Sequence, residues 1–452
     1  MPTSAGAGTA TAEGRRALVE RARARLDTDR IADLVEAMTA IASPTGEEHA
    51  LATHVTARLT GVGIEARVQD LGGGSANAVA TIGRAGDGPT VLVYAPLDTA
   101  FAGEVSEDLP FLGSTPRADF VRVPLRDGTC VVGLGAENPK GFAAAAIAAI
   151  EALAPDADAL AGEMLLGLVG GSMPVGTRPG HGDPILGHGR GIAALLDVEH
   201  PDAAIILKPG WAAMHEEVGY AWFRVELRGA VGYTGIRHKA PYRNPVLAGA
   251  RLALGLEAWF AAYTARWSDG LVAPQGSINA IHAGSPDRAS FVPAHATLDL
   301  DLRISPRATP DTVEDELRAV VRDLAAGMPE VDVSIERVAA VPGSATDPGH
   351  WIVEGAVRAW EDLESRTHEL PRNQSGASDV GVLRARGIPA VRVGLPPAGA
   401  PSPYQGFSMG VADAGAVRRL AELLVRLLVD VTARSRDELD LPDRDARQRG
   451  HG

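Results

Sequence analysis

Residues 43–48 have the sequence Ser-Pro-Thr-Gly-Glu-Glu and separate two segments of helical periodicity. Before them, apolar residues recur at helical spacing through residues 14–41, which predicts one or two amphipathic helices. The proline and glycine of residues 43–48 interrupt this pattern, because neither favours a continuous helix. Glu47 and Glu48 then lie at the start of a further helix, where a carboxylate interacts favourably with the positive end of the helix dipole. We therefore expect a chain break at residues 43–48, followed by a new helix.

Beyond this segment, short β-rich runs alternate with helical segments. The runs are Ala78–Ile82, Thr90–Tyr94, Met164–Val169 and Ala203–Leu207. Gly141–Ala154 has the spacing of a helix and would cross over between two of these runs. Buried apolar strands joined by crossover helices are typical of a mostly parallel α/β sheet with flanking helices.

The pattern changes near residue 216, where strands and helices alternate in a second arrangement. The expected elements are Val218–Arg228, Pro245–Thr264, Ala296–Ile304, Thr309–Met328 and Val331–Val338. This order predicts an inserted α+β domain with an antiparallel sheet. The α/β pattern then resumes, with a helix at Pro348–Leu363, a strand at Pro389–Val393 and a last helix at Val411–Ala433.

These patterns divide the chain into two domains. Residues 14–215 and 339–433 would form a catalytic-type α/β domain, and residues 216–338 the inserted domain. Residues 1–13 are predicted to be a disordered arm. The tail 434–452 is charged and almost without apolar periodicity, so we expect it to be frayed.

Composition limits the classes of partner. The 452 residues carry a formal net charge of −14, which argues against nucleic acid or an anionic membrane as a partner but allows a small anionic substrate. No apolar run reaches the length of a membrane helix, and residues 1–13 lack a signal segment, so a cytoplasmic location is expected. The single cysteine, Cys130, excludes an internal disulfide and a cysteine-based metal cluster.

The order and spacing of several short motifs make the chain similar to a known family over roughly residues 30–430. The motifs are Ser43–Glu48, Asn77 with its strand, Val91–Thr99, Gly133–Gly141, Ser375–Asp379 and Gly387–Pro389. They resemble those of the zinc-dependent aminoacylase/carboxypeptidase family, which includes glutamate carboxypeptidase and succinyl-diaminopimelate desuccinylase. The resemblance implies hydrolysis of amide bonds and a homodimer formed through the inserted domain.

Such enzymes hold a pair of zinc ions that activate a bridging water, and a glutamate takes the water's proton. This chain departs from the family at each position that the chemistry needs. The histidine of the family's His-x-Asp is Pro96, while the following aspartate remains as Asp98. The bridging aspartate corresponds to Asn138, the glutamate pair to Met173-Pro174, the next carboxylate to Lys208 and the terminal histidine to Pro401. Proline, methionine and lysine do not replace these zinc ligands, so the sequence predicts that the metal site is absent and that no cofactor is bound.

Lys208 is the most informative of these substitutions. Its ammonium group would carry positive charge into the former cation pocket, with Asp98 as the nearest counter-ion and Lys140 as a second cation. We hypothesise a Lys208–Asp98 pair at the position of the first metal. The alternative is that Lys208 is a structural or solvated lysine.

Other residues correspond to positions that bind the substrate carboxylate in the family. Tyr233 replaces the histidine of the inserted domain, and His238 and Arg243 follow it. Further candidates are Asn279, Arg303, Ser378 and Asp379. Arginine suits this role because its planar fork donates two hydrogen bonds to a carboxylate, although Arg303 could instead pair with a neighbouring aspartate on its own strand. The expected substrate is therefore a small molecule with a carboxylate.

The glycine- and histidine-rich loop at residues 176–191 is open to three interpretations: a replacement metal site, a cover over the substrate, or a solvated loop. It contains His181, Asp183, His188 and Arg190. A nucleophile is not evident, because the residues around Ser172 lack the second glycine of a nucleophile elbow and Cys130 lies in a β-like run. Two functions thus stay open: a metal-independent enzyme for C–N hydrolysis or a related cyclisation or elimination, and an inactive relative that binds a ligand or partner.

Overall fold

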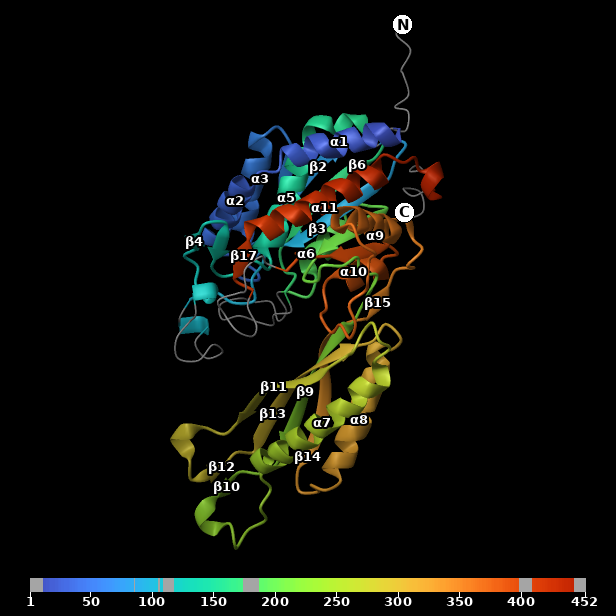
Figure 1. Cartoon of the computed structure of the whole chain (residues 1–452). Helices are drawn as coiled ribbons and strands as arrows, with labels where there is room; N and C mark the ends of the chain where they lie inside the picture. Colours follow the sequence, from blue (N-terminus) through green and yellow to red (C-terminus); the bar gives the residue numbers. More distant parts are fainter. Residues whose placement is uncertain are drawn as a thin grey trace. The chain divides into compact units, whose positions relative to one another are not determined.

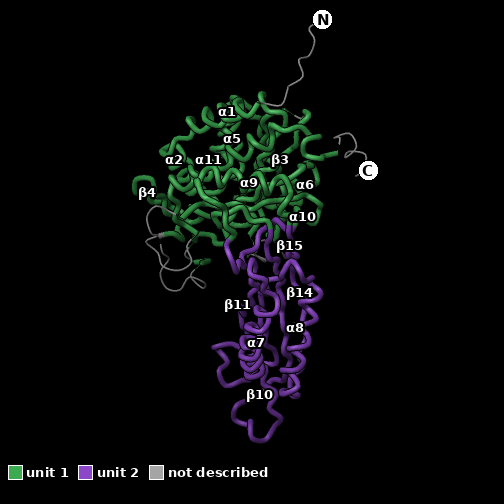
Figure 2. The backbone as a smooth tube through the Cα atoms, turned by 45° about the vertical axis from the view of Figure 1, so that its right-hand side comes forward, with its two compact units in different colours: residues 1–215, 346–370, 382–452 green, residues 216–345, 371–381 purple. Residues whose placement is uncertain are grey.

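A computed structural model describes residues 11–84, 86–104, 106–108, 118–173, 187–397 and 409–442. The chain forms two compact units (Figure 2). Unit 1 comprises residues 1–215, 346–370 and 382–452, and unit 2 comprises residues 216–345 and 371–381. The segment 371–381 belongs to unit 2 because Gln374 pairs with Val272 in an isolated bridge.

The core of unit 1 is a sheet of six strands in the order β1-β2-β6-β3-β7-β16. Its strands are β1 (Glu65–Gly72), β2 (Ser75–Gly83), β6 (Glu163–Val169), β3 (Thr90–Pro96), β7 (Ala203–Leu207) and β16 (Ala390–Val393). Strands β6, β3, β7 and β16 run parallel, whereas β1 and β2 form an antiparallel edge. The predicted mostly parallel α/β sheet is confirmed. Strand β1 was not predicted because its residues are largely exposed and polar.

Helices cover both faces of this sheet. On one face α5 (Lys140–Leu153) and α11 (Ala414–Thr432) lie side by side against β3 and β6 (Figure 1). Almost every residue of α5 is buried, because its run of alanines lets neighbouring helices approach closely. On the other face, α6 (Arg190–Leu196) packs Leu195 beside Leu92 and Gly167. The remaining helices of unit 1 are α1 (Ala12–Ala24), α2 (Thr28–Ala40), α3 (His49–Gly61), α9 (Trp351–Glu364) and α10 (Val380–Ala385), the last beginning in unit 2.

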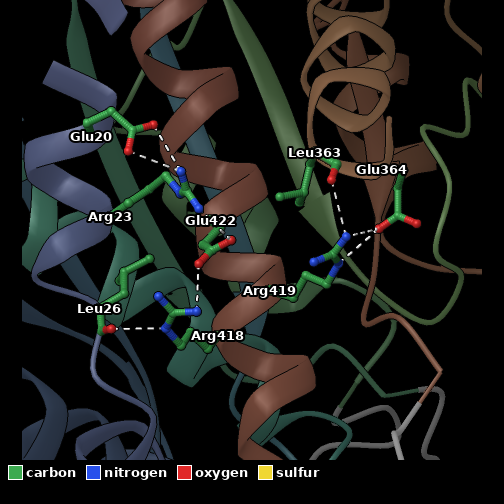
Figure 3. Close-up of polar contacts among 8 residues, drawn as sticks. All are labelled: Glu20, Arg23, Leu26, Leu363, Glu364, Arg418, Arg419 and Glu422. Atoms are coloured by element: carbon green, nitrogen blue, oxygen red, sulfur yellow. Dashed lines mark hydrogen bonds and ion pairs between the residues drawn. The ribbon is translucent and has the colours of Figure 1, made fainter. Parts of the chain in front are cut away.

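Two neighbouring arginines connect α11 to helices on either side (Figure 3). Arg418 pairs with the buried Glu422 at 2.7 Å and donates to the Leu26 carbonyl beyond α1. Arg419 points the other way and pairs with Glu364 at the end of α9, also at 2.7 Å. Because consecutive residues on a helix point in different directions, one turn of α11 contacts both neighbours.

Unit 2 has an antiparallel sheet of four strands in the order β11-β13-β9-β14. The strands are β9 (Gly219–Arg228), β11 (Gly276–Ala283), β13 (His295–Ile304) and β14 (Asp332–Val341). Helices α7 (Pro245–Trp267) and α8 (Pro310–Ala325) pack on one face, around buried residues such as Phe223 and Leu252. The predicted inserted domain with an antiparallel sheet is confirmed. Edge strand β11 was missed, since its side chains are half-buried or exposed.

Short strands complete both units. In unit 1, β4 (Leu125–Asp127), β5 (Cys130–Val132) and β17 (Val411–Asp413) form a small sheet. In unit 2, β8 (Glu216–Glu217) pairs with β15 (Ser344–Ala345), and β10 (Gly232–Tyr233) pairs with β12 (Phe291–Val292). Among the described residues, α7 is the one helix long and apolar enough to cross a membrane, and 33% of its apolar window is buried inside the structure.

The ends of the chain differ from the sequence-based expectation. Helix α1 begins at Ala12 with Thr11 as its N-cap, so the predicted arm loses its last residues to a helix, and residues 1–10 lie outside the described part. The prediction of a frayed tail is wrong for residues 434–442. Arg436 is buried and makes a two-pronged ion pair with buried Asp202, with both N–O distances 2.8 Å. A single long-range pair of this kind leaves no periodicity in the sequence.

We expect Arg436→Ala to destabilise the protein by about 3–5 kcal/mol, because removing one partner of a buried ion pair leaves an uncompensated charge on Asp202. The matched control is Arg434→Ala, whose half-exposed pair with Asp430 spans one helical turn and should contribute at most about 1 kcal/mol. Urea unfolding of the full chain measures both. Equal losses of stability in the two variants would contradict the conclusion that the Arg436–Asp202 pair stabilises the fold more than the Arg434–Asp430 pair.

Candidate functional site

The candidate site lies where three parallel strands of unit 1 end. Asp98 follows β3, Ser172 follows β6 and Lys208 follows β7, and these strands are neighbours in the sheet. The carboxyl ends of parallel strands meet at one edge of a sheet, which is where α/β proteins bind their ligands. All three side chains are buried.

The turn after β6, residues 170–173, is held by side chains from other segments. Its successive N–H groups donate to Asn77 Oδ1, Glu48 Oε1, Asp98 Oδ1 and Asp98 Oδ2, at 3.0, 3.0, 3.1 and 2.7 Å. The turn contains Gly171 with a positive φ of 63°, a backbone conformation that glycine adopts without a steric penalty. Buried carboxylates therefore take the role that water or a ligand would otherwise have.

Glu48 lies at the N-terminus of α3, as predicted, and its side chain has a further role. Its side chain does not cap α3; Oε1 instead accepts from the Gly46 N–H at 2.7 Å and from the turn 170–173. Burial, and next the charge of Asp98, raise the pKa of Glu48 to about 7. The sequence suggested no such contact, since Glu48 and Gly171 are distant along the chain.

Asp98 is wholly buried and fully hydrogen-bonded. Besides the two N–H groups of the turn, its Oδ2 accepts from the Thr45 hydroxyl at 2.9 Å. Burial raises the pKa of Asp98, while the Met173 N–H and the charge of Lys208 act in the opposite direction. Asp98 thus both stabilises the turn and contributes to the charge around Lys208.

Lys208 points inward, as the hypothesis requires, but its hydrogen bond is to a neutral group. Its Nζ lies 3.4 Å from Ser172 Oγ, and the Tyr94 hydroxyl donates to the same oxygen at 2.9 Å. Within the described part of the chain, no carboxylate oxygen lies within 4.0 Å of Lys208 Nζ, so Asp98 acts on it through space. Tyr94 was not among the predicted site residues, because its contact joins separate strands. Ser172 was set aside because its flanking residues lack the second glycine of a nucleophile elbow.

Lys140 lies at the start of α5 and donates to the Ile41 carbonyl at 2.8 Å. Burial lowers the pKa of Lys140 to about 7. The neighbouring Glu137 has its pKa raised to about 7 by burial as well. The structure therefore associates Lys140 with the segment before residues 43–48, and no contact between Lys140 and Lys208 or Asp98 occurs among the described residues.

The described side chains near the ends of these strands do not form a set of ligands for a pair of zinc ions. Among the described residues, no group of three or more His, Cys, Asp or Glu side chains could hold a metal. Pro96 ends β3, Asn138 lies just before α5, and Met173 and Lys208 follow β6 and β7. The oxygens of Asp98 accept hydrogen bonds from N–H and hydroxyl groups. An ammonium group beside the site also repels a cation. Pro174 and Pro401 lie outside the described residues.

Four of the predicted substrate-binding residues of unit 2 make no contact with one another in the described structure. Tyr233 on β10 is half-exposed and contacts Phe291, and His238 is exposed in the segment that follows. Arg243 donates to the Glu330 carbonyl at 2.6 Å. Asn279 is exposed on β11, where it accepts from Ser277.

Of the other predicted residues of unit 2, Ser378 and Asp379 are buried and Arg303 is partly buried. Arg303 pairs with Asp301 at 3.1 Å, as the alternative interpretation expected, and lies over the Tyr220 ring at 5.9 Å. Burial and then the charge of Asp379 raise the pKa of Tyr220. Ser378 is buried, and its hydroxyl accepts from the Val380 N–H. Tyr220 was missed because its strand pattern is that of a core residue.

The loop that could have supplied a metal site is described only in part. His181 and Asp183 lie outside the described residues. His188 is partly buried, and burial lowers its pKa to about 4. Arg190 begins α6 and donates to the Leu71 carbonyl at 2.9 Å.

Comparisons with known proteins agree with this architecture. Residues 215–329 match the M20 peptidase dimerisation domain. Human carnosine dipeptidase 1 is similar over 92% of this chain and 99% of its own, with 14% identity and a TM-score of 0.69. A dipeptidase of Saccharomyces cerevisiae is similar over 94% of this chain and 100% of its own, with 12% identity and a TM-score of 0.68. The chain has the fold of the M20 peptidases. An M20 metallo-carboxypeptidase of Sulfolobus solfataricus also shares this fold. It is similar over 90% of this chain and 98% of its own, with 12% identity and a TM-score of 0.64.

The substitution Glu48→Gln should remove part of the pH dependence of stability. Since the pKa of Glu48 is about 7 in the folded protein and 4.5 ordinarily, the folded state binds more protons between these values. The contribution of Glu48 to stability is therefore complete below pH 4.5 and lost as the pH rises through about 7. Glutamine keeps the Oε1 acceptor but does not ionise.

Urea unfolding at several pH values tests this expectation. The stability of Glu48→Gln relative to the wild type should rise across this interval. Glu65→Gln, at an exposed position of β1, is the control for loss of a carboxylate. A constant difference between Glu48→Gln and the wild type across the interval would contradict the proposed protonation.

Proposed function

We propose that the protein is an amide hydrolase with the M20 peptidase fold that acts without zinc on a small substrate carrying an amide and a carboxylate. The observation that carries the proposal is Lys208, a buried cation at the edge of the sheet where such folds perform their chemistry. A buried ammonium group without a carboxylate contact is costly, and such costs are typical of functional sites. Amide cleavage needs stabilisation of the negative charge that develops on the carbonyl oxygen and transfer of a proton to the leaving nitrogen, and a lysine can supply both.

The carboxylates support this role without acting as metal ligands. Asp98 and Glu48 are close enough for the charge of each to influence the other, and burial holds the pKa of Glu48 near 7. Near neutral pH the pair therefore carries less negative charge than two free carboxylates would. Lys208 then interacts with the substrate in a site that is not dominated by anions.

The alternative, an inactive relative that binds a ligand, is favoured by one observation. The carboxylates at the site accept hydrogen bonds from the turn 170–173, so they have a structural use without catalysis. This observation does not account for Lys208, whose ammonium group contributes no ion pair among the described residues. We therefore favour the enzyme.

We further propose that the protein is a homodimer joined through unit 2. Helix α7 exposes Val246, Leu247 and Leu254, the last 75% exposed, and β11 is an edge strand with exposed Ile281. Apolar side chains on a helix beside a free strand edge suit pairing with a second copy. The match to a dimerisation domain supports this arrangement. A cytoplasmic location stays a prediction.

Activity on a panel of N-acyl amino acids and dipeptides tests the proposed function. The wild type should hydrolyse at least one of them, and the rate should be the same in the presence of a chelator as in the presence of added zinc. Lys208→Met should lower kcat/KM at least about a hundredfold, the usual effect of removing a proton-transfer group. Lys239→Met, at an exposed lysine of unit 2, should leave it unchanged. Chelator-sensitive activity that zinc restores would refute the proposal.

Leu254→Glu should convert the dimer into a monomer, because it introduces a charge into the apolar surface of α7. Val62→Glu, at a similarly exposed apolar side chain of unit 1, is the matched control and should stay dimeric. Sedimentation or light scattering of the full chain gives the mass. A wild type that is monomeric at micromolar concentration would contradict the proposal.

A further inference from the structure

Ser172 lacks the flanking glycine of a nucleophile elbow in the sequence, but the fold gives it the hydrogen-bond partners of a functional serine. Strands β6, β3 and β7 are neighbours, and Tyr94 on β3 lies in register with Gly167 of β6 and Ile206 of β7. Tyr94 therefore lies between the strand that leads to Ser172 and the strand that leads to Lys208. The three polar groups meet at one end of the parallel part of the sheet.

Ser172 Oγ is the centre of this group. The Tyr94 hydroxyl donates to it at 2.9 Å, and Lys208 Nζ lies 3.4 Å from it. All three residues are almost fully buried, with 0, 4 and 6% exposure for Tyr94, Ser172 and Lys208. A serine oxygen within hydrogen-bond reach of a basic nitrogen is the arrangement that activates a hydroxyl as a nucleophile.

The backbone of Ser172 is held independently of its side chain. Its N–H and that of Met173 both donate to Asp98, and the two preceding N–H groups donate to Asn77 and Glu48. These bonds fix the turn, so the hydroxyl is presented in one direction. A preorganised nucleophile avoids the entropic cost of orienting it during the reaction.

A purely structural role explains this group poorly. A hydroxyl pair such as Tyr94 with Ser172 would satisfy both groups without a buried ammonium. The hydrogen-bond partner that the structure gives Lys208 is this serine, and burying a charge against a neutral partner costs more than one hydrogen bond returns. The position of Lys208 is better explained by a reaction in which it exchanges a proton with Ser172.

We propose that Ser172 is the nucleophile of the amide hydrolysis, with Lys208 as its general base and Tyr94 as a positioning residue. The inference rests on the proposed function. Ser172 Oγ attacks the amide carbonyl carbon and forms a C–O bond, while Lys208, in the molecules in which it is present as the free amine, takes the hydroxyl proton. The C–N bond then breaks, and Lys208 returns that proton to the leaving nitrogen, which departs as an amine.

The second half-reaction restores the enzyme. Water attacks the carbonyl carbon of the acyl-Ser172 ester and gives a proton to Lys208. The ester C–O bond breaks, Ser172 Oγ regains the proton from Lys208, and a carboxylic acid is released. The sum consumes one amide and one water and yields one acid and one amine, without an oxidant or a metal.

A fluorophosphonate probe tests the nucleophile directly, since attack by an activated serine forms a P–O bond and releases fluoride. Intact mass and peptide mapping of the wild-type full chain should show one adduct, on Ser172. Labelling should be lost in Ser172→Ala and slowed at least about a hundredfold in Lys208→Met. Ser334→Ala and Lys239→Met, both at exposed positions of unit 2, should label at the wild-type rate.

Tyr94→Phe separates positioning from folding. It should slow labelling while the Ser172 adduct still forms, and its unfolding midpoint reports any loss of structure. Amide turnover is measured beside labelling so that the two proposals fail separately. Two results would reject Ser172 as the nucleophile while leaving the proposed function intact. They are amide turnover that persists in Ser172→Ala, and amide turnover by a wild type that forms no adduct on Ser172. An adduct on Ser172 without turnover of any amide overturns the proposed function instead.

Discussion

The N–H groups of the turn 170–173 are the constraint on which the site depends. Each must be satisfied inside the protein, because the turn is buried, and the four donate to three side chains that come from different segments. Asn77 belongs to β2, Glu48 to the segment before α3, and Asp98 to the end of β3. The turn therefore joins the antiparallel edge of the sheet to its parallel centre. The same bonds orient Ser172 toward Lys208.

Most of the fold could be predicted from the sequence because burial leaves a periodic pattern. The strands and helices found were those whose side chains alternate or recur between buried and exposed positions, such as β9 and α8. Strands β1 and β11 were missed since they lie at sheet edges, where few side chains are buried. The ordered end of unit 1 was missed because it depends on the pair between Arg436 and Asp202, a contact across the chain that no local pattern records.

The sequence predicted site residues only at positions that correspond to a known motif of the family. Lys208 and Asp98 were identified by their positions in the motifs, and the structure brings them to the same edge of the sheet. Glu48, Tyr94 and Ser172 are ordinary residues in their own segments, and their importance arises from contacts between distant strand ends. Spacing within a segment carries no information about such contacts. Lys140 shows the reverse case, since the contact it makes in the structure is with the Ile41 carbonyl.

The charges at the strand ends follow from how the N–H groups are satisfied. Asp98 accepts two backbone N–H groups and the Thr45 hydroxyl, so three of the roughly four acceptor sites of its carboxylate are already used. Free carboxylates in a buried pocket would require metal ions to balance their charge. Backbone N–H groups that donate hydrogen bonds to these carboxylates stabilise the charge instead, so metal ions are no longer required. Among the described side chains that follow β3, β6 and β7, the charge that then remains without a contacting counter-ion is the ammonium group of Lys208. Its hydrogen bond to Ser172 directs that charge at the one hydroxyl whose backbone the same carboxylates hold in place.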